Sequence, residues 1–300
     1  MIVCGRFLVE AVFYTIGKYK FPAGRQFDVV RNFRNKVSVQ LRLCLRPKAG
    51  LANRRVSLLS FNSASKGGTR VKFCDRLFQN VQPIWEKSHQ HPFVKGIGNG
   101  ELELDKFQFY IIQDYLYLIE YAKVYALGVV KAKDLQVMSK FARQIDGILN
   151  GEMNIHKEYA KRLGISIEEM EQAKPASMNL AYTNYMLSVS QSGTLAELVA
   201  SLLPCMWSYW EIGKRLNNVP GASEHEFYGE WIRGYSSEEY AELCIWVIEL
   251  MNELAEGKSE KELAHLEEIF MTTSRFEYLF WDMAYRKETW SFDEQCSTIS

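Results

Sequence analysis

The stretch LLPCMWSYW, residues 202–210, decides how the rest of the chain is interpreted. It carries no charged side chain, which predicts that most of it is buried. Pro204 lacks a backbone donor and tends to kink a helix. Cys205 and Tyr209 are four residues apart, so they share one helix face and can line one cavity. Taken alone, the stretch favours Cys205 as a small core residue, the usual role of a buried cysteine, and leaves a nucleophile facing a cavity as the alternative.

Apolar residues recur at spacings of three and four along residues 71–300, which predicts an all-α fold. The expected helices span residues 71–89, 104–131, 134–163, 167–173, 177–192, 195–216, 224–234, 237–255 and 259–287. Residues 91–100 contain three glycines at alternate positions. No strand precedes them and no Gly-Lys-Ser/Thr follows, so we expect a tight loop rather than a phosphate-binding site.

The helix expected at residues 104–131 is rich in tyrosine and phenylalanine, which places it in the centre of a bundle or against another subunit. Asp114 lies in the middle of it, on the same face as Tyr117. A buried carboxylate is costly unless it is hydrogen-bonded. Asp114 is therefore expected to contact either a neighbouring helix or a ligand, and the sequence leaves both open.

Glu277 is the second acidic residue in apolar surroundings, within FEYLFW at residues 276–281. If it is buried, desolvation raises its pKa and makes it a proton donor near neutral pH. The competing interpretation is an exposed glutamate on the outer stripe of an amphipathic helix.

Glu152 and His156 are four residues apart and have the residue types of a helical di-iron site. Such a site needs a second pair of this kind on a facing helix, and the sequence offers none. We expect no metal, and His156 is interpreted as a residue that packs against or supports another site residue.

Residues 1–70 differ in charge from the remainder: they hold 14 Lys and Arg against 2 Asp and Glu, whereas residues 71–300 hold 22 against 34. The segment resembles a transit peptide or a nucleic-acid-binding arm in composition. We favour a third interpretation, in which it is an upstream leader translated in frame by an incorrect gene model. Lys66-Gly67-Gly68 can be encoded by a purine-rich run like a ribosome-binding site, and Val71 follows as a candidate start codon. A peptide from residues 1–65 in the native protein would contradict this.

The composition, 47% hydrophobic and 24% charged, is that of a globular protein. No uncharged apolar run approaches the roughly 18 residues of a membrane span. The six cysteines have no metal-ligand spacing, which indicates a reducing cytoplasm. We therefore expect a cytoplasmic protein without a membrane or nucleic-acid partner, with one domain at residues 71–292 and a short tail at 293–300.

Several separate motifs together resemble the TenA/thiaminase II family. They are Pro204-Cys205-x-Trp207-x-Tyr209, His91-Pro92-Phe93-Val94-x-Gly96-Ile97-Gly98, Gln113-Asp114 with Tyr117, and Phe280-Trp281-x-Met283-Ala284-Tyr285-Arg286. The resemblance covers residues 71–290 and implies a haem oxygenase-like helical bundle without haem, a homotetramer and no cofactor. Having Cys205 places the chain in the cysteine-containing branch.

By motif match, the resemblance implies that Cys205 is the nucleophile and Glu277 the acid/base. It also implies a pyrimidine pocket formed by Asp114, Tyr117, Tyr182, Tyr209 and Tyr235. The implied activity is hydrolysis of 4-amino-5-aminomethyl-2-methylpyrimidine to hydroxymethylpyrimidine in thiamin salvage, with slower cleavage of thiamin. The alternatives are a non-catalytic pyrimidine-binding or regulatory protein and a metal-dependent oxygenase, both on the same fold.

Overall fold

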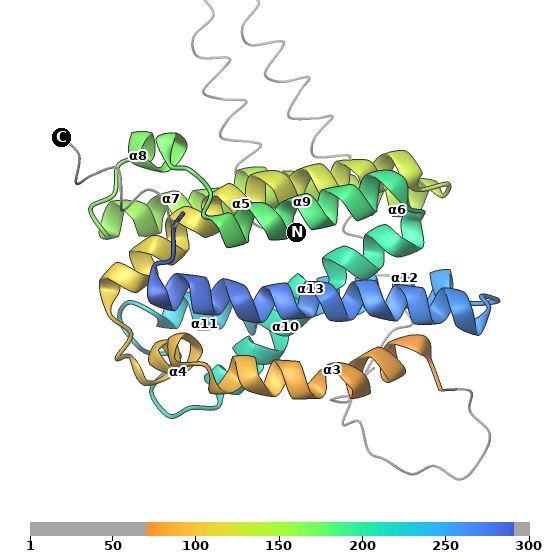
Figure 1. Ribbon diagram of the computed structural model, residues 1–300. Coiled ribbons are helices and arrows are strands. Elements are labelled where there is room, and N and C mark those ends of the chain that lie inside the picture. Colours follow the sequence, from red (N-terminus) through yellow and green to blue (C-terminus); the bar gives the residue numbers. More distant parts are fainter. Residues whose placement is uncertain (1–70, 291–300) are drawn as a thin grey trace, which may run out of the picture. The chain divides into compact units, whose positions relative to one another are not determined.

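Residues 71–290 are the part of the chain that the computed structural model describes, and within them every regular element is helical (Figure 1). The expectations for residues 1–70 and 293–300 lie outside the described residues. The elements are α3 (Phe73–Gln90), α4 (Pro92–Asn99), α5 (Leu104–Lys131), α6 (Leu135–Asp146), the π-helical η1 (Gly147–Glu152), α7 (Met153–Arg162), α8 (Ile167–Gln172), α9 (Ser177–Ser192), α10 (Leu195–Asn217), α11 (Gly229–Tyr235), α12 (Glu238–Ala255) and α13 (Glu260–Arg286). This confirms the all-α prediction.

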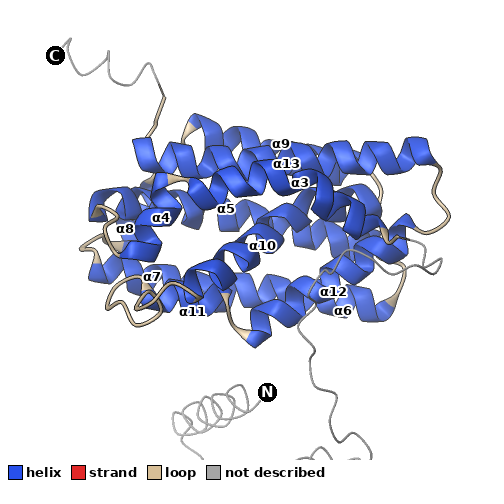
Figure 2. Cartoon of the chain, turned by 90° about the horizontal axis from the view of Figure 1, so that it is seen from below, coloured by secondary structure: helices blue, strands red, loops and turns tan. Residues whose placement is uncertain are grey.

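Helix α10 is the central element, and it contains the stretch with Cys205. It contacts α5, α9, α11, α12 and α13, and Figure 2 shows it crossing the middle of the bundle. Its residues from Leu198 to Pro204 are all buried, as the absence of charge predicts. Pro204 lies inside α10, and the helix continues through it. A helix that is apolar on most of its faces is stable only in such a position.

The prediction of a loop at residues 91–100 is wrong, because residues 92–99 form helix α4. His91 caps this helix by accepting the Phe93 N–H, and Gly100 ends it in the left-handed conformation, with φ 76°. The other glycines are needed for close packing. A Cβ on Gly96 would lie 3.0 Å from the backbone of Leu102.

The single helix expected at residues 134–163 is divided by the π-helical turn η1. Such turns insert an extra residue and are frequent at functional sites. Two of its residues, Ile148 and Glu152, line the cavity described below. Helix α11 also differs from its prediction, because residues 224–228 form turns before it begins at Gly229.

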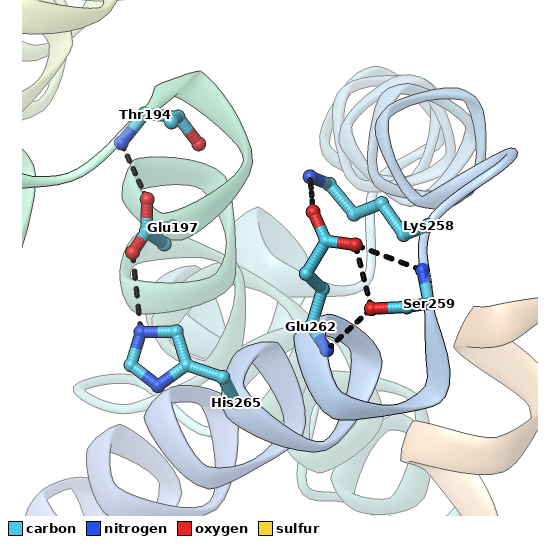
Figure 3. A network of polar contacts seen from close by, with 6 residues as sticks. All are labelled: Thr194, Glu197, Lys258, Ser259, Glu262 and His265. Atoms are coloured by element: carbon cyan, nitrogen blue, oxygen red, sulfur yellow. Dashed lines mark hydrogen bonds and ion pairs between the residues drawn. The ribbon is translucent and has the colours of Figure 1, made fainter.

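Capping residues set where several helices begin (Figure 3). Ser259 and Glu262 form a capping box at the start of α13. Glu197 bonds the Thr194 N–H at the start of α10 and also His265 of α13, at 3.1 Å. The cap of α12 is Ser237, whose hydroxyl accepts the Tyr240 N–H.

None of the described helices combines the length and the apolar character that crossing a membrane would require.

Candidate active site

A cavity opens beside the middle of α10, between this helix and α5, η1, α11 and α12. It contains about 450 Å³ of atom-free space, part of it open to solvent. The lining is dominated by phenol rings and carboxylates. The lining residues are Asp114, Tyr117, Leu118, Tyr121, Tyr125, Gln144, Ile148, Glu152, Cys205, Met206, Tyr209, Tyr235, Tyr240 and Leu243.

Cys205 lies on the wall of this cavity and is half-buried, whereas Pro204 and Met206 on either side of it are buried. Burial raises the pKa of the Cys205 thiol well above its usual value, and the nearby charge of Glu277 raises it further. A hydrogen bond with Tyr117 opposes this shift in part. Cys205 is therefore a neutral thiol in the resting protein, and it becomes a nucleophile only when a nearby base takes its proton.

Glu277 comes from α13 and is buried, with 2% of its surface exposed, so the alternative of an exposed glutamate does not hold. Burial raises the pKa of its carboxyl to about 8, and hydrogen bonds from Tyr182 and Cys205 limit the rise. Glu277 is not among the cavity-lining residues, and it reaches the cavity through its contact with the Cys205 thiol. The nucleophile and the acid expected from the sequence thus meet, although they are on different helices.

Tyr182 of α9 donates a hydrogen bond to the Glu277 carboxylate. The hydroxyls of Tyr182 and Tyr117 are 3.4 Å apart, and their rings pack with centroids at 5.2 Å. Tyr117 lines the cavity, whereas Tyr182 does not. Tyr182 therefore holds the Glu277 side chain from outside the cavity lining, and Tyr117 is hydrogen-bonded to both Tyr182 and Cys205.

Asp114 lies on the cavity wall and is paired with a histidine from α7. His156 Nε2 is 2.7 Å from Asp114 Oδ2, and both residues are almost fully buried. The other ring nitrogen of His156 lies 3.0 Å from the backbone carbonyl of Glu152. Asp114 therefore has a neighbouring helix as its partner and still faces the cavity, and His156 supports it.

Tyr209 and Tyr235 also line the cavity, and their ring centroids are 4.8 Å apart. The hydroxyl of Tyr209 is 3.4 Å from that of Tyr110, behind the wall. Tyr235 donates a hydrogen bond of 3.1 Å to Glu152. Burial raises the pKa of Glu152, and the charge of Asp114 adds to this effect.

Other lining residues were not foreseen from the sequence. Tyr121 and Tyr125 follow Tyr117 at steps of four along α5, so this spacing was a signal that they share its face. Gln144 and Tyr240 carried no such signal, because they come from helices whose approach to α5 depends on the tertiary fold.

Within residues 71–290, no group of three or more His, Cys, Asp and Glu side chains is arranged to hold a metal ion. Glu152 and His156 lie near each other, but both ring nitrogens of His156 are already engaged.

Comparisons with known proteins identify the family of the chain. Residues 78–287 match the model of the TENA/THI-4/PQQC family. The chain is 55% identical over 223 residues to an aminopyrimidine aminohydrolase of Halalkalibacterium halodurans, covering 74% of this chain and all of that protein.

Solved structures show the same fold. A TenA homologue from P. horikoshii superposes with a TM-score of 0.67 at 30% identity, over 72% of this chain and 99% of that one. A domain of unknown function with a haem oxygenase-like fold from Shewanella denitrificans superposes with a TM-score of 0.59 at 16% identity, over 71% and 92%. The second likeness confirms the predicted fold class, and the family match confirms the resemblance found in the sequence. The chain belongs to the TENA/THI-4/PQQC family.

Proposed function

We propose that the protein is an aminopyrimidine aminohydrolase of thiamin salvage. It converts 4-amino-5-aminomethyl-2-methylpyrimidine and water to hydroxymethylpyrimidine and ammonia. The observation that carries this proposal is the contact between the Cys205 thiol and the Glu277 carboxyl, beside a cavity lined with phenols and the buried Asp114.

The first step needs two proton movements, and Glu277 supports both. With a pKa of about 8, its carboxyl is protonated at neutral pH and gives its proton to a ring nitrogen of the pyrimidine. The resulting carboxylate takes the proton of Cys205 as the sulfur adds to the electrophilic ring. The ring thereby loses its aromaticity.

Glu277, which now carries the proton from Cys205, gives it to the amine, and the amine leaves from the methylene carbon as ammonia; the thiazole of thiamin leaves as a neutral group without this proton. In the reaction of the aminomethylpyrimidine, water then adds to the exposed methylene and loses one proton to the Glu277 carboxylate. The bond between Cys205 and the ring breaks, the sulfur regains a proton as the ring nitrogen loses one, and the aromatic ring is restored. Asp114 accepts a hydrogen bond from the amino group of the pyrimidine, and the tyrosines pack on the ring.

Steady-state kinetics with the aminomethylpyrimidine and thiamin side by side test this proposal. We expect equal amounts of ammonia and hydroxymethylpyrimidine, and a higher kcat/KM for the aminomethylpyrimidine than for thiamin. Binding without turnover would favour a regulatory role, and stoichiometric iron in the purified protein would favour an oxygenase.

We further propose a homotetramer in the cytoplasm, with residues 71–292 as the functional unit and residues 1–70 as a gene-model extension. Val130 and Leu135, at the junction of α5 and α6, are 81% and 77% exposed, which supports a subunit contact there. Light scattering tests the tetramer, and mass spectrometry of the native protein tests the extension.

A further inference from the structure

The imidazole of His156 lies between two acceptors. Nδ1 is 3.0 Å from the backbone carbonyl oxygen of Glu152, and Nε2 is 2.7 Å from Oδ2 of Asp114. A carbonyl oxygen only accepts hydrogen bonds, so Nδ1 carries a proton. The remaining question is whether Nε2 also carries a proton.

We infer that His156 is a positioning residue that carries protons on both ring nitrogens and holds Asp114 by its Oδ2 atom, so that the free oxygen of Asp114 selects pyrimidines with an amino group at C4. The inference rests on the proposed function and deepens it, because it assigns substrate selection to a residue that does not line the cavity.

The surroundings favour a charged imidazole. The separation of 2.7 Å is typical of a hydrogen bond between a cationic N–H and a carboxylate. Burial by itself lowers the pKa of His156, but the hydrogen bond and charge of Asp114, together with Glu152, outweigh burial and raise it. Tyr235, which also faces Glu152, is a neutral donor.

A second histidine of the chain shows the opposite arrangement. His91 is equally buried and faces Asp282, but its Nδ1 accepts the backbone N–H of Phe93 and therefore carries no proton. Its Nε2 is 3.6 Å from Asp282, and burial lowers its pKa. His91 is not among the residues that line the cavity, so it provides a control for the loss of a buried histidine beside an aspartate.

The consequence for the substrate follows from the second oxygen of Asp114. Within the described part of the chain, the carboxylate receives one hydrogen bond, the one from His156 to Oδ2. Asp114 lines the cavity, which leaves Oδ1 for a ligand. This oxygen is a hydrogen-bond acceptor, so it favours a pyrimidine that presents an N–H group to it. Without the imidazole, Oδ2 of Asp114 loses its hydrogen bond, the carboxyl group is no longer held in one orientation, and its preference for a donor weakens.

The experiment compares hydroxymethylpyrimidine with its analogue that has hydrogen in place of the amino group at C4. Dissociation constants are measured by calorimetry for the wild type, His156→Gln, His156→Phe and the control His91→Gln. We expect the wild type and His91→Gln to prefer the amino compound by on the order of 30-fold, and the two His156 variants by about threefold. Nitrogen-15 NMR of the wild type at neutral pH should show both ring nitrogens of His156 protonated.

A single protonated nitrogen on His156 overturns the inference, and this result needs no variant to fold. An unchanged preference in folded His156 variants overturns it as well. If either of these two results is found but the wild type hydrolyses the aminomethylpyrimidine, only the inference about His156 is wrong, and the proposed function is still supported. A wild type that neither binds nor hydrolyses the pyrimidine contradicts the proposed function itself.

Discussion

The phenol of Tyr182 donates a hydrogen bond to the carboxylate of Glu277, although the two residues are 95 positions apart in the chain. This bond favours the charged form of Glu277 and holds its pKa below the value that burial alone would give. The helix α9 therefore adjusts the acidity of a group on α13.

Activity should fall as pH rises through about 8, because the first step needs the protonated form of Glu277. In Tyr182→Phe the pKa of Glu277 rises further, so the alkaline decline should move to higher pH while kcat drops roughly tenfold. The measurement is the pH profile of kcat/KM. Tyr185→Phe, on the same helix and packed on Phe276, is the control and should keep the wild-type profile. An unmoved decline in Tyr182→Phe would show that Glu277 does not set it.

Cys205→Ser should reduce kcat by a factor on the order of 10³ or more, because a serine hydroxyl is a far weaker nucleophile at neutral pH. Pyrimidine binding, measured by calorimetry, should persist. Cys74→Ser is the control, since Cys74 is a buried thiol on α3 that bonds the Ile248 carbonyl. Turnover at the wild-type rate in Cys205→Ser would rule out covalent catalysis by this residue.

The stability of the protein should depend on pH through Glu277. Its carboxyl has a pKa of about 8 in the fold against 4.5 when unperturbed, so the folded state binds the proton more tightly. The resulting stabilisation is complete below about 4.5 and is lost as pH rises to about 8.

Glu277→Gln removes this dependence, because the amide stays neutral and its carbonyl still accepts from Tyr182. Relative to this variant, the wild type should lose on the order of several kcal/mol of unfolding free energy across that range. Urea unfolding at a series of pH values measures the difference. Parallel curves for the two proteins would mean that Glu277 is not desolvated.

Gly213→Ala should disturb the cavity wall where α10 packs against the end of α11. An added Cβ would lie 2.6 Å from the backbone of Tyr235, so the end of α11 must shift. We expect a loss of about 1–3 kcal/mol in unfolding free energy and a higher KM. Gly234→Ala is the matched control, because a Cβ at that position meets no atom within 4 Å. Equal KM values for the two variants would contradict a role for this close contact.

The sequence determined much of the helical architecture. The bounds predicted for residues 104–131 and 177–192 coincide with α5 and α9, because regular apolar spacing and flanking breaks are local signals. Helix α4 was missed for a tertiary reason, since Gly96 signals backbone freedom in the sequence but in the fold lets α4 pack against Leu102. The π-helical turn η1 likewise has no periodic signature of its own.

The candidate residues were visible in the sequence as polar groups in apolar surroundings, which is a local property of Cys205, Asp114 and Glu277. Their convergence was not visible, because it depends on how α5, α10 and α13 pack. The pairing of Asp114 with His156, 42 positions away, arises only when α7 lies against α5. The charge state of a buried carboxyl group depends on the groups that pack around it. Groups from distant segments of the chain come together only in the folded protein. The sequence thus identified the candidate groups, and the tertiary structure decided which of them are hydrogen-bonded to one another.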